Sequence, residues 1–356
     1  KASVLMYPEA SYSFDGTATP LPDSLGRLVK LLKCPVVTII THGAFQRVSH
    51  EAGFFPHFIV DISHHTALLG GDLNDLDLSQ IDEGFGIGEE TKEKAILKLS
   101  TMGVKMGYPD KVRPLYEKLV FNPEDSLFDI MLALGEIAKL NMLAKLDQPT
   151  EPENWQMPGH MVNACYDPFV NDITFPAAIL QAPFYSLKQT RSENLGGIGS
   201  VIGHEISHAF DSNGAKCDEN GNINNWWTED DFKRFEAKVQ QMIEQFDGIE
   251  LPWGKVNGAF IVSENMADNG GMSVTLDIMS QTNDVSYEEY FYNWARIWCD
   301  KARPEFLQMI LAIDVHGPSI LRANIPPRNF KEWYTTFDVK ETDKMYLAPD
   351  KRIVIW

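Results

Sequence analysis

The chain has 356 residues, 44% of them hydrophobic, which is the profile of a folded protein of one or two domains. Its formal net charge of -19 repels nucleic acid and anionic membrane surfaces, so neither is an expected partner. No apolar run reaches about 18 residues, which argues against a membrane span. The scattered cysteines form no close pairs and predict a reducing, cytoplasmic compartment, with a secreted or surface form as the alternative: Cys34, Cys165, Cys217 and Cys299.

Two regions of the chain differ in pattern. Residues 1–85 contain glycine, proline and short strand-like runs such as Cys34–Thr41, and they end in an acidic, turn-prone stretch at 70–78. Helical periodicity begins at Glu89. The boundary predicts an N-terminal segment over 1–85 and a mainly helical domain over 86–356. The expected elements of that domain are helices over 89–102, 125–146, 198–210, 231–246 and 287–303 and an edge strand over 162–166.

The strongest motif is His-Glu-x-x-His, formed by His204, Glu205 and His208. On a helix, positions i and i+4 lie one turn apart on the same face, so both imidazoles can reach one metal ion. Zinc accepts neutral imidazole in tetrahedral geometry and keeps a position for water at catalytic sites. Glu205 is then placed to take a proton from that water. By itself the motif also arises by chance, so a third ligand is needed.

Glu264 and Asp268 are a second pair at i and i+4. One helical face can offer the Glu264 carboxylate to the metal and the Asp268 carboxylate to a ligand histidine, which usually donates its other N–H to such a group. The alternative is a solvated helix face. The zinc site that still lacks a ligand, and the small pair Gly270–Gly271 that follows, favour the functional interpretation.

Together these motifs resemble the neprilysin family of zinc metallopeptidases, peptidase family M13, over about residues 85–356. The resemblance is greatest to its bacterial PepO-type oligopeptidases, and it implies a mainly α fold with a small β component, a thermolysin-like (gluzincin) catalytic domain with one zinc ion. The matching segments are Gly107–Asp110, Asn163–Tyr166, Ile173–Phe184, Gly203–Phe210, Asn225–Trp227, Glu264–Asp268, Asp314–His316 and Ile355–Trp356.

The same resemblance implies roles for residues outside the metal motif. His316 is similar to the family's oxyanion-stabilising histidine, oriented by Asp314, and Arg322 to an arginine that grips a substrate carbonyl. Asn163 and Ala164 resemble the edge that binds the backbone of an extended peptide. Residues similar to those that line the pocket for the side chain after the cut, P1′, are Phe184, Val201 and Trp298.

The N-terminal region departs from the family. Its members carry a large helical lid domain before the catalytic portion, and the chain length predicts that this lid is absent and the cleft open, with weaker activity and a looser size limit. Residues 1–50 instead resemble a fragment of a lysophospholipid acyltransferase, through Val4–Pro20 and Leu31–Ile40. The His/Asp pair needed for acyl transfer is missing, so this segment is expected to be non-catalytic.

Three functional classes are suggested by these motifs and resemblances. The favoured one is a zinc-dependent endopeptidase that cuts internal bonds of short peptides and prefers a bulky apolar residue at P1′. The alternative is a zinc- and peptide-binding pseudoenzyme, with little activity because the lid is missing. An acyltransferase is the third class, and it is excluded because the His/Asp pair that would act as its base is missing. Physiological substrate and oligomeric state are not determined by the sequence.

Overall fold

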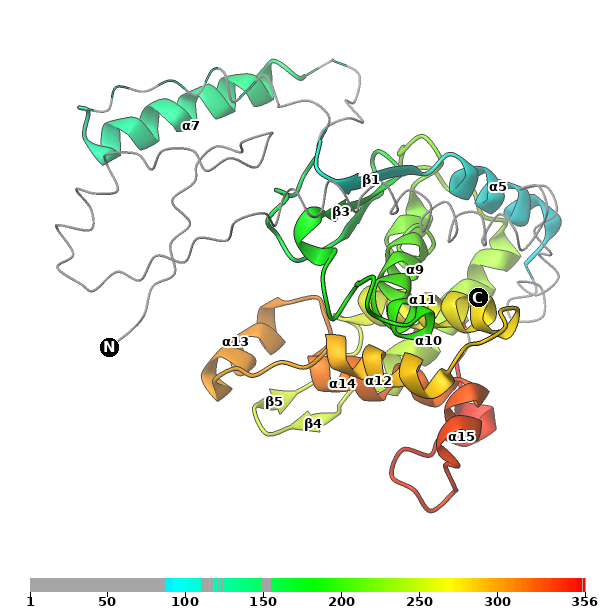
Figure 1. Cartoon of the computed structure of the whole chain (residues 1–356). Coiled ribbons are helices and arrows are strands. Elements are labelled where there is room, and N and C mark those ends of the chain that lie inside the picture. Colours follow the sequence, from blue (N-terminus) through cyan, green and yellow to red (C-terminus); the bar gives the residue numbers. More distant parts are fainter. Residues whose placement is uncertain are drawn as a thin grey trace, which may run out of the picture. The chain divides into compact units, whose positions relative to one another are not determined.

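The computed structural model describes residues 87–109, 124–146, 155–353 and the single residues 115, 118, 120, 122, 148 and 355. All of these lie in one compact unit over 65–356. The acyltransferase-like segment, the boundary near residue 85, Cys34, Asp110 and Trp356 lie outside the described residues. Within them the chain is mainly helical with a small β component, as predicted (Figure 1).

The small sheet has three strands in the order β1-β3-β2, spanning Gly103–Gly107, Asp172–Pro176 and Cys165–Asp167. β1 runs parallel to β3 and β2 runs antiparallel to it. The expected edge strand therefore exists, but it begins at Cys165 rather than Val162, because pairing with β3 starts where Cys165 meets Thr174. A two-stranded hairpin, β4 (Glu250–Leu251) with β5 (Gly254–Lys255), lies elsewhere.

Helices form most of the remaining structure, and several expected bounds change. The helix expected over 287–303 ends at Ile297, with Trp298 as its C-cap, and a separate helix starts at Pro304. The residue before a proline is driven out of the helical region, and Arg303 has ψ 146°, so no single helix could run on through Arg303 into the second one. The helices are α5 (Glu89–Ser100), α7 (Leu127–Leu143), α8 (Arg191–Asn194), α9 (Ser200–Ser207), α10 (Glu229–Phe246), α11 (Val262–Ser280), α12 (Tyr287–Ile297), α13 (Pro304–Ile313), α14 (Ser319–Asn324) and α15 (Lys331–Phe337).

The segment before α9 is a π-helical turn, η3 (Leu195–Gly199), rather than the start of a regular α-helix. Gly197 has φ −101° and ψ −107°, and a Cβ atom there would lie 2.3 Å from the carbonyl oxygen of Phe184. That close approach lets Ile198 donate its N–H to Phe184 O at 2.7 Å. Glycine at this position thus joins the loop before α8 to the entry of α9.

α11 is the central helix of the core. Its first half contributes Val262 and Met266 to a cluster with the aromatic side chains of Trp226, Trp227 and Phe235. Its second half packs in another cluster with η3 and α12. It also packs against α9 (Figure 1), so both helices that carry predicted ligands are held between the two clusters.

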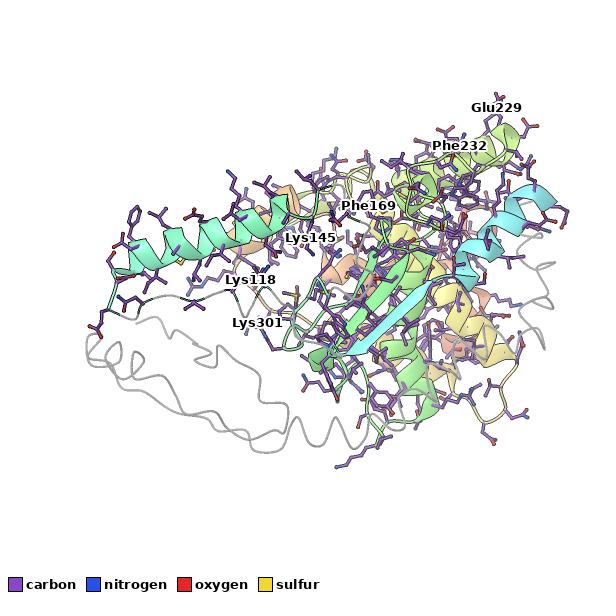
Figure 2. The ribbon with its side chains drawn as sticks, turned by 90° about the horizontal axis from the view of Figure 1, so that it is seen from above. Lys118, Lys145, Phe169, Glu229, Phe232 and Lys301 are labelled. Atoms are coloured by element: carbon purple, nitrogen blue, oxygen red, sulfur yellow. The ribbon has the colours of Figure 1, made fainter. Side chains whose placement is uncertain are left out.

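Helices α7 and α13 contribute little to this core, and Leu311 of α13 packs against the edge of the first cluster. None of the side chains of α7 or α13 is buried among the described residues. Lys145 follows the end of α7 (Figure 2). No helix in the described part of the chain, α7 and α13 included, is long and apolar enough to cross a bilayer.

A buried carboxylate joins α5 to α10, whose first turn carries Glu229 and Phe232 (Figure 2). Asp231 is 1% exposed and accepts hydrogen bonds from Thr228 Oγ1 at 2.6 Å, Thr91 Oγ1 at 2.5 Å, Gly88 N at 3.0 Å and the guanidinium of Arg234. Burial alone would raise the pKa of Asp231, but these donors outweigh it and lower the pKa to about 2.

We expect Asp231→Asn to destabilise the protein by about 2 kcal/mol near neutral pH, the linkage value of a pKa lowered by nearly two units. The folded pKa is below the unfolded one, so the stabilisation is present above about pH 4 and is lost as the pH falls toward about 2. Urea unfolding at several pH values measures it. The exposed neighbour in Asp230→Asn is the control, and an equal loss in both variants would contradict the assignment.

Candidate metal centre

The two motif histidines lie on consecutive turns at the end of α9. His204 and Glu205 are 6% and 5% exposed, and His208 is the C-cap of the helix. The Nε2 atoms of His204 and His208 are 3.0 Å apart, and the rings meet edge to face. Helical spacing has therefore brought two imidazole nitrogens to one point, as the sequence predicts.

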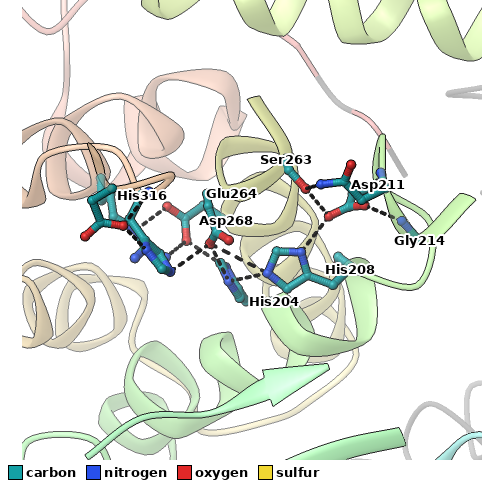
Figure 3. Close-up of polar contacts among 12 residues, drawn as sticks. His204, His208, Asp211, Gly214, Ser263, Glu264, Asp268 and His316 are labelled. Atoms are coloured by element: carbon teal, nitrogen blue, oxygen red, sulfur yellow. Dashed lines mark hydrogen bonds and ion pairs between the residues drawn. The ribbon is translucent and has the colours of Figure 1, made fainter. Parts of the chain in front are cut away.

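α11 brings Glu264 to the same point (Figure 3). Its Oε2 atom lies 3.3 Å from His204 Nε2 and 3.6 Å from His208 Nε2. A tetrahedral zinc ion with ligands at about 2.0–2.1 Å separates its ligand atoms by about 3.3 Å. The three separations of 3.0, 3.3 and 3.6 Å match that value. Glu264 Oε2 is also buried without a hydrogen-bond partner among the described residues, so the donor set fits a zinc ion.

This contact depends on a glycine pair where α9 crosses α11. A Cβ atom on Gly203 would lie 2.8 Å from Gly271 Cα, and one on Gly271 would lie 2.4 Å from Ser200 O. Only two residues without side chains allow the backbones to approach so closely. The small residues noted in the sequence thus set the distance between the two helices.

Asp268 supports His204 from behind. Its Oδ1 atom lies 2.9 Å from His204 Nδ1, so it can accept the imidazole N–H and leave Nε2 free for a metal. Arg322 donates to the same carboxylate from Nε at 2.8 Å and from Nη2 at 2.7 Å, and its guanidinium stacks on the Trp298 ring at 3.7 Å. Burial raises the pKa of Asp268, but the charge and hydrogen bonds of Arg322 outweigh it and lower that pKa.

Asp211 supports His208 in the same way, and it is a residue that the sequence analysis missed. Its Oδ2 atom lies 2.6 Å from His208 Nδ1 and also accepts from the hydroxyl of Ser263, while Oδ1 accepts from the backbone N–H of Asn213 and Gly214, each at 2.7 Å (Figure 3). The available signal was an aspartate three residues after the second motif histidine.

The buried charges shift one another's pKa values. Burial lowers the pKa of both histidines, but nearby carboxylates outweigh it and raise that of His204 and, more strongly, that of His208. Burial raises the pKa of Glu264, but the two imidazoles overcome this and lower it well below its usual range. Burial also raises the pKa of Glu205, and this effect is larger than the opposing effect of the two imidazoles. Glu205 is therefore the carboxylate in the site best able to exchange a proton.

His316 approaches from the loop between α13 and α14. Its Nε2 atom lies 3.3 Å from Glu264 Oε2, and its Nδ1 atom lies 2.6 Å from Asp314 Oδ1. The side chain of His316 is 44% exposed, so it stands at the open side of the site (Figure 3).

A cleft of about 520 Å³ surrounds these groups. Nearly all the site residues predicted from the sequence line this cleft. The exception is Asp314, which does not line the cleft but contacts His316, which does. Those lining residues are Asn163, Ala164, Phe184, Val201, His204, Glu205, His208, Glu264, Asp268, Trp298, His316 and Arg322.

Comparison with known proteins agrees with the resemblance to peptidase family M13 that the sequence motifs indicate. The model of peptidase family M13 matches residues 163–353. The chain is 51% identical to a neutral endopeptidase of Lactococcus lactis over 278 residues, covering 78% of this chain and 44% of that protein. It is similar to the crystal structure of PepO from Lactobacillus rhamnosis, with a TM-score of 0.75 and 48% identity over 78% of this chain and 44% of that one. It is also similar to Mycobacterium tuberculosis zinc metalloprotease Zmp1 in complex with an inhibitor, with a TM-score of 0.70 and 37% identity over 75% of this chain and 43% of that one. The chain thus spans less than half the length of these relatives.

The geometry predicts different zinc losses for the two acidic residues of α11. Glu264→Ala should abolish tight zinc binding because it removes a direct donor. Asp268→Ala should weaken zinc affinity by roughly 10- to 100-fold, the usual effect of removing a partner of a ligand histidine. Metal analysis and competition with a chelator measure both. Asp314→Asn is the control, because it alters a carboxylate that contacts His316, which is not a proposed ligand. Unchanged zinc affinity in Glu264→Ala would rule out Glu264 as the third ligand.

Proposed function

The chain belongs to peptidase family M13, and on that premise we propose that its described residues form the catalytic site of a zinc-dependent endopeptidase. The observation that carries this proposal is the convergence of His204, His208 and Glu264 donor atoms within 3.6 Å of one another beside Glu205. The 51% identical relative from Lactococcus lactis is a neutral endopeptidase. A reducing compartment, expected from the cysteine pattern, accords with the free thiols of Cys165, Cys217 and Cys299.

We assign one zinc ion to His204, His208 and Glu264. When bound, zinc acts as a Lewis acid that polarises a carbonyl group and acidifies a water molecule. Asp268 and Asp211 accept the Nδ1 protons of the two histidines, which selects the tautomer whose Nε2 lone pair faces the metal. These two contacts keep the donor atoms aligned before any substrate binds.

Glu205 is the general base of the proposed reaction. Its burial in the cleft raises its pKa, so a proton taken from the attacking water can be held and then delivered to the leaving amine. The neighbouring imidazoles oppose this rise, and Glu264 adds to it. The carboxylate is thus able to accept a proton and release it within one turnover.

Two hydrogen-bond donors, His316 and Arg322, line the cleft in which the scissile carbonyl would gain negative charge. His316 is held by Asp314 at the open side of the cleft. Arg322 is buried, fixed by Asp268 and stacked on Trp298. Donors fixed in advance stabilise a developing oxyanion without reorganisation. We therefore assign oxyanion stabilisation to His316 and a substrate carbonyl contact to Arg322.

The substrate in this proposal is an extended peptide. β2 is one of the two edge strands of the sheet, and its pairing among the described residues is with β3. Asn163 and Ala164 come directly before it and line the cleft. An edge strand offers unpaired backbone groups to which a peptide can bind as a further strand. Cys165 and Tyr166 of β2 line the same cleft as the proposed zinc ligands, which supports an extended peptide as the substrate.

We also assign a P1′ pocket that prefers bulky apolar residues. Phe184, Val201 and Trp298 line the cleft, and each packs against the cluster around α12. Apolar walls of this kind favour a large apolar side chain through the hydrophobic effect.

The decisive test is Glu205→Gln. This variant should keep its zinc, because Glu205 is not assigned as a ligand, and lose about 10²- to 10⁴-fold in turnover, the usual contribution of a general base. Zinc content and cleavage of a short quenched peptide by the wild type and the variant measure this. Turnover near the wild-type value would contradict the mechanism, and zinc binding without turnover in the wild type would favour the peptide-binding pseudoenzyme.

The pocket is tested with peptides that differ only at P1′. The wild type should cleave a P1′ phenylalanine peptide at least about 10- to 200-fold faster, in kcat/KM, than a P1′ alanine peptide, since that range is typical of a difference of even one methylene group in an apolar pocket. Phe184→Ala should reduce that ratio. Leu187, 55% exposed on the same loop, serves as the control in Leu187→Ala. An unchanged ratio in Phe184→Ala would remove Phe184 from the pocket.

A further inference from the structure

Lys98 on α5 is a buried cation that the proposed mechanism does not use. Its side chain is 1% exposed, and its ammonium donates to three backbone carbonyls: Ala209 O at 2.8 Å, Gly214 O at 2.7 Å and Cys217 O at 2.7 Å. All three N–H bonds of an ammonium group are thereby used. The rings of Tyr166, Phe210 and Trp226 surround it at 5.8–5.9 Å from their centroids.

All three carbonyls belong to the turn that follows α9, residues 209–217. This turn carries Asp211, whose carboxylate contacts Nδ1 of His208. It folds tightly, because a Cβ atom on Gly214 would lie 1.8 Å from the carbonyl oxygen of His208. Asp211 in turn accepts the N–H of Gly214, so its carboxylate can contact His208 only while the turn keeps this shape.

Electrostatics favour a cation at this point. The carbonyl groups at the C-terminal end of a helix carry partial negative charge, and Ala209 comes directly after the C-cap of α9. Burial lowers the pKa of Lys98 to about 8, while the Cys217 thiol and the Asp211 carboxylate oppose that effect. An ammonium group therefore persists near neutral pH even though it is removed from water.

We propose that Lys98 is a positioning residue of the zinc site: its ammonium group fixes the turn 209–217 and, through Asp211, the imidazole of His208. Lys98 lies 111 residues before Ala209 and outside the part of the chain that the M13 family model matches. The inference rests on the proposed zinc site and adds a residue from α5 to the groups that determine zinc affinity.

The test measures the zinc dissociation constant of the 356-residue chain by competition with a chelator, without reference to peptidase activity. Lys98→Met removes the three donors while keeping the length and apolar stem of the side chain. We expect its dissociation constant to rise roughly 10-fold, the lower end of the range for partners of metal ligands. Lys92→Met is the matched control, since Lys92 is a second buried lysine of α5 whose ammonium pairs with Glu89.

A double-mutant cycle then asks whether the effect passes through Asp211. If it does, Lys98→Met should add little to the loss caused by Asp211→Asn, because both changes remove the same support from His208. Fully additive losses would overturn the proposal. So would an unchanged zinc affinity in a folded Lys98→Met protein, or an equal loss in Lys92→Met.

If Lys98→Met does not fold, Lys98→Gln provides the same measurements, since its amide retains two N–H donors on a shorter side chain. It should show a smaller loss of zinc affinity that is again not additive with Asp211→Asn. Wild-type affinity in Lys98→Gln, or additivity with Asp211→Asn, would overturn the proposal there. Wild-type protein that binds no zinc, or that binds zinc without cleaving peptides, would instead count against the proposed function.

Discussion

The close contact of α9 with α11 is the constraint on which the site depends. Gly203 and Gly271 bring the two backbones together at a distance that no Cβ atom would permit. One helix then presents His204 and His208 while the other presents Glu264, with donor atoms 3.0–3.6 Å apart. A side chain at either glycine would push the helices apart and separate the carboxylate from the imidazoles. The precision of the proposed zinc site therefore comes from packing between helices as much as from the ligands.

Charge balance explains why so many ionisable groups can be buried together. Four carboxylates lie in or behind the site, on Glu205, Asp211, Glu264 and Asp268. Two buried cations, Lys98 and Arg322, offset half of their charge, and one zinc ion would offset the rest. Without a metal the carboxylates raise the pKa of both ligand histidines, so protons take up part of the missing positive charge. Zinc binding and histidine deprotonation are thus expected to be coupled.

The supporting contacts extend well beyond the metal. His204 is held by Asp268, and Asp268 by Arg322, which stacks on Trp298 in the same cleft. His208 is held by Asp211, whose turn is held by Lys98. Each chain of contacts ends on a different element, α14 on one side and α5 on the other. Residues distant in the sequence can therefore influence zinc affinity, and the Arg322 chain also connects the metal to the predicted substrate pocket.

The sequence by itself determined the parts of the site that follow from helix geometry. Spacings of four residues place His204 with His208, and Glu264 with Asp268, on single helical faces whatever those helices pack against. The tertiary structure decided which faces meet and where β2 begins, because these depend on contacts with other elements. It also decided the partner of His208: Asp211 is only three residues away, yet it reaches the imidazole because the helix stops and a turn, closed by Gly214 and held by Lys98 from 111 residues upstream, folds back onto it.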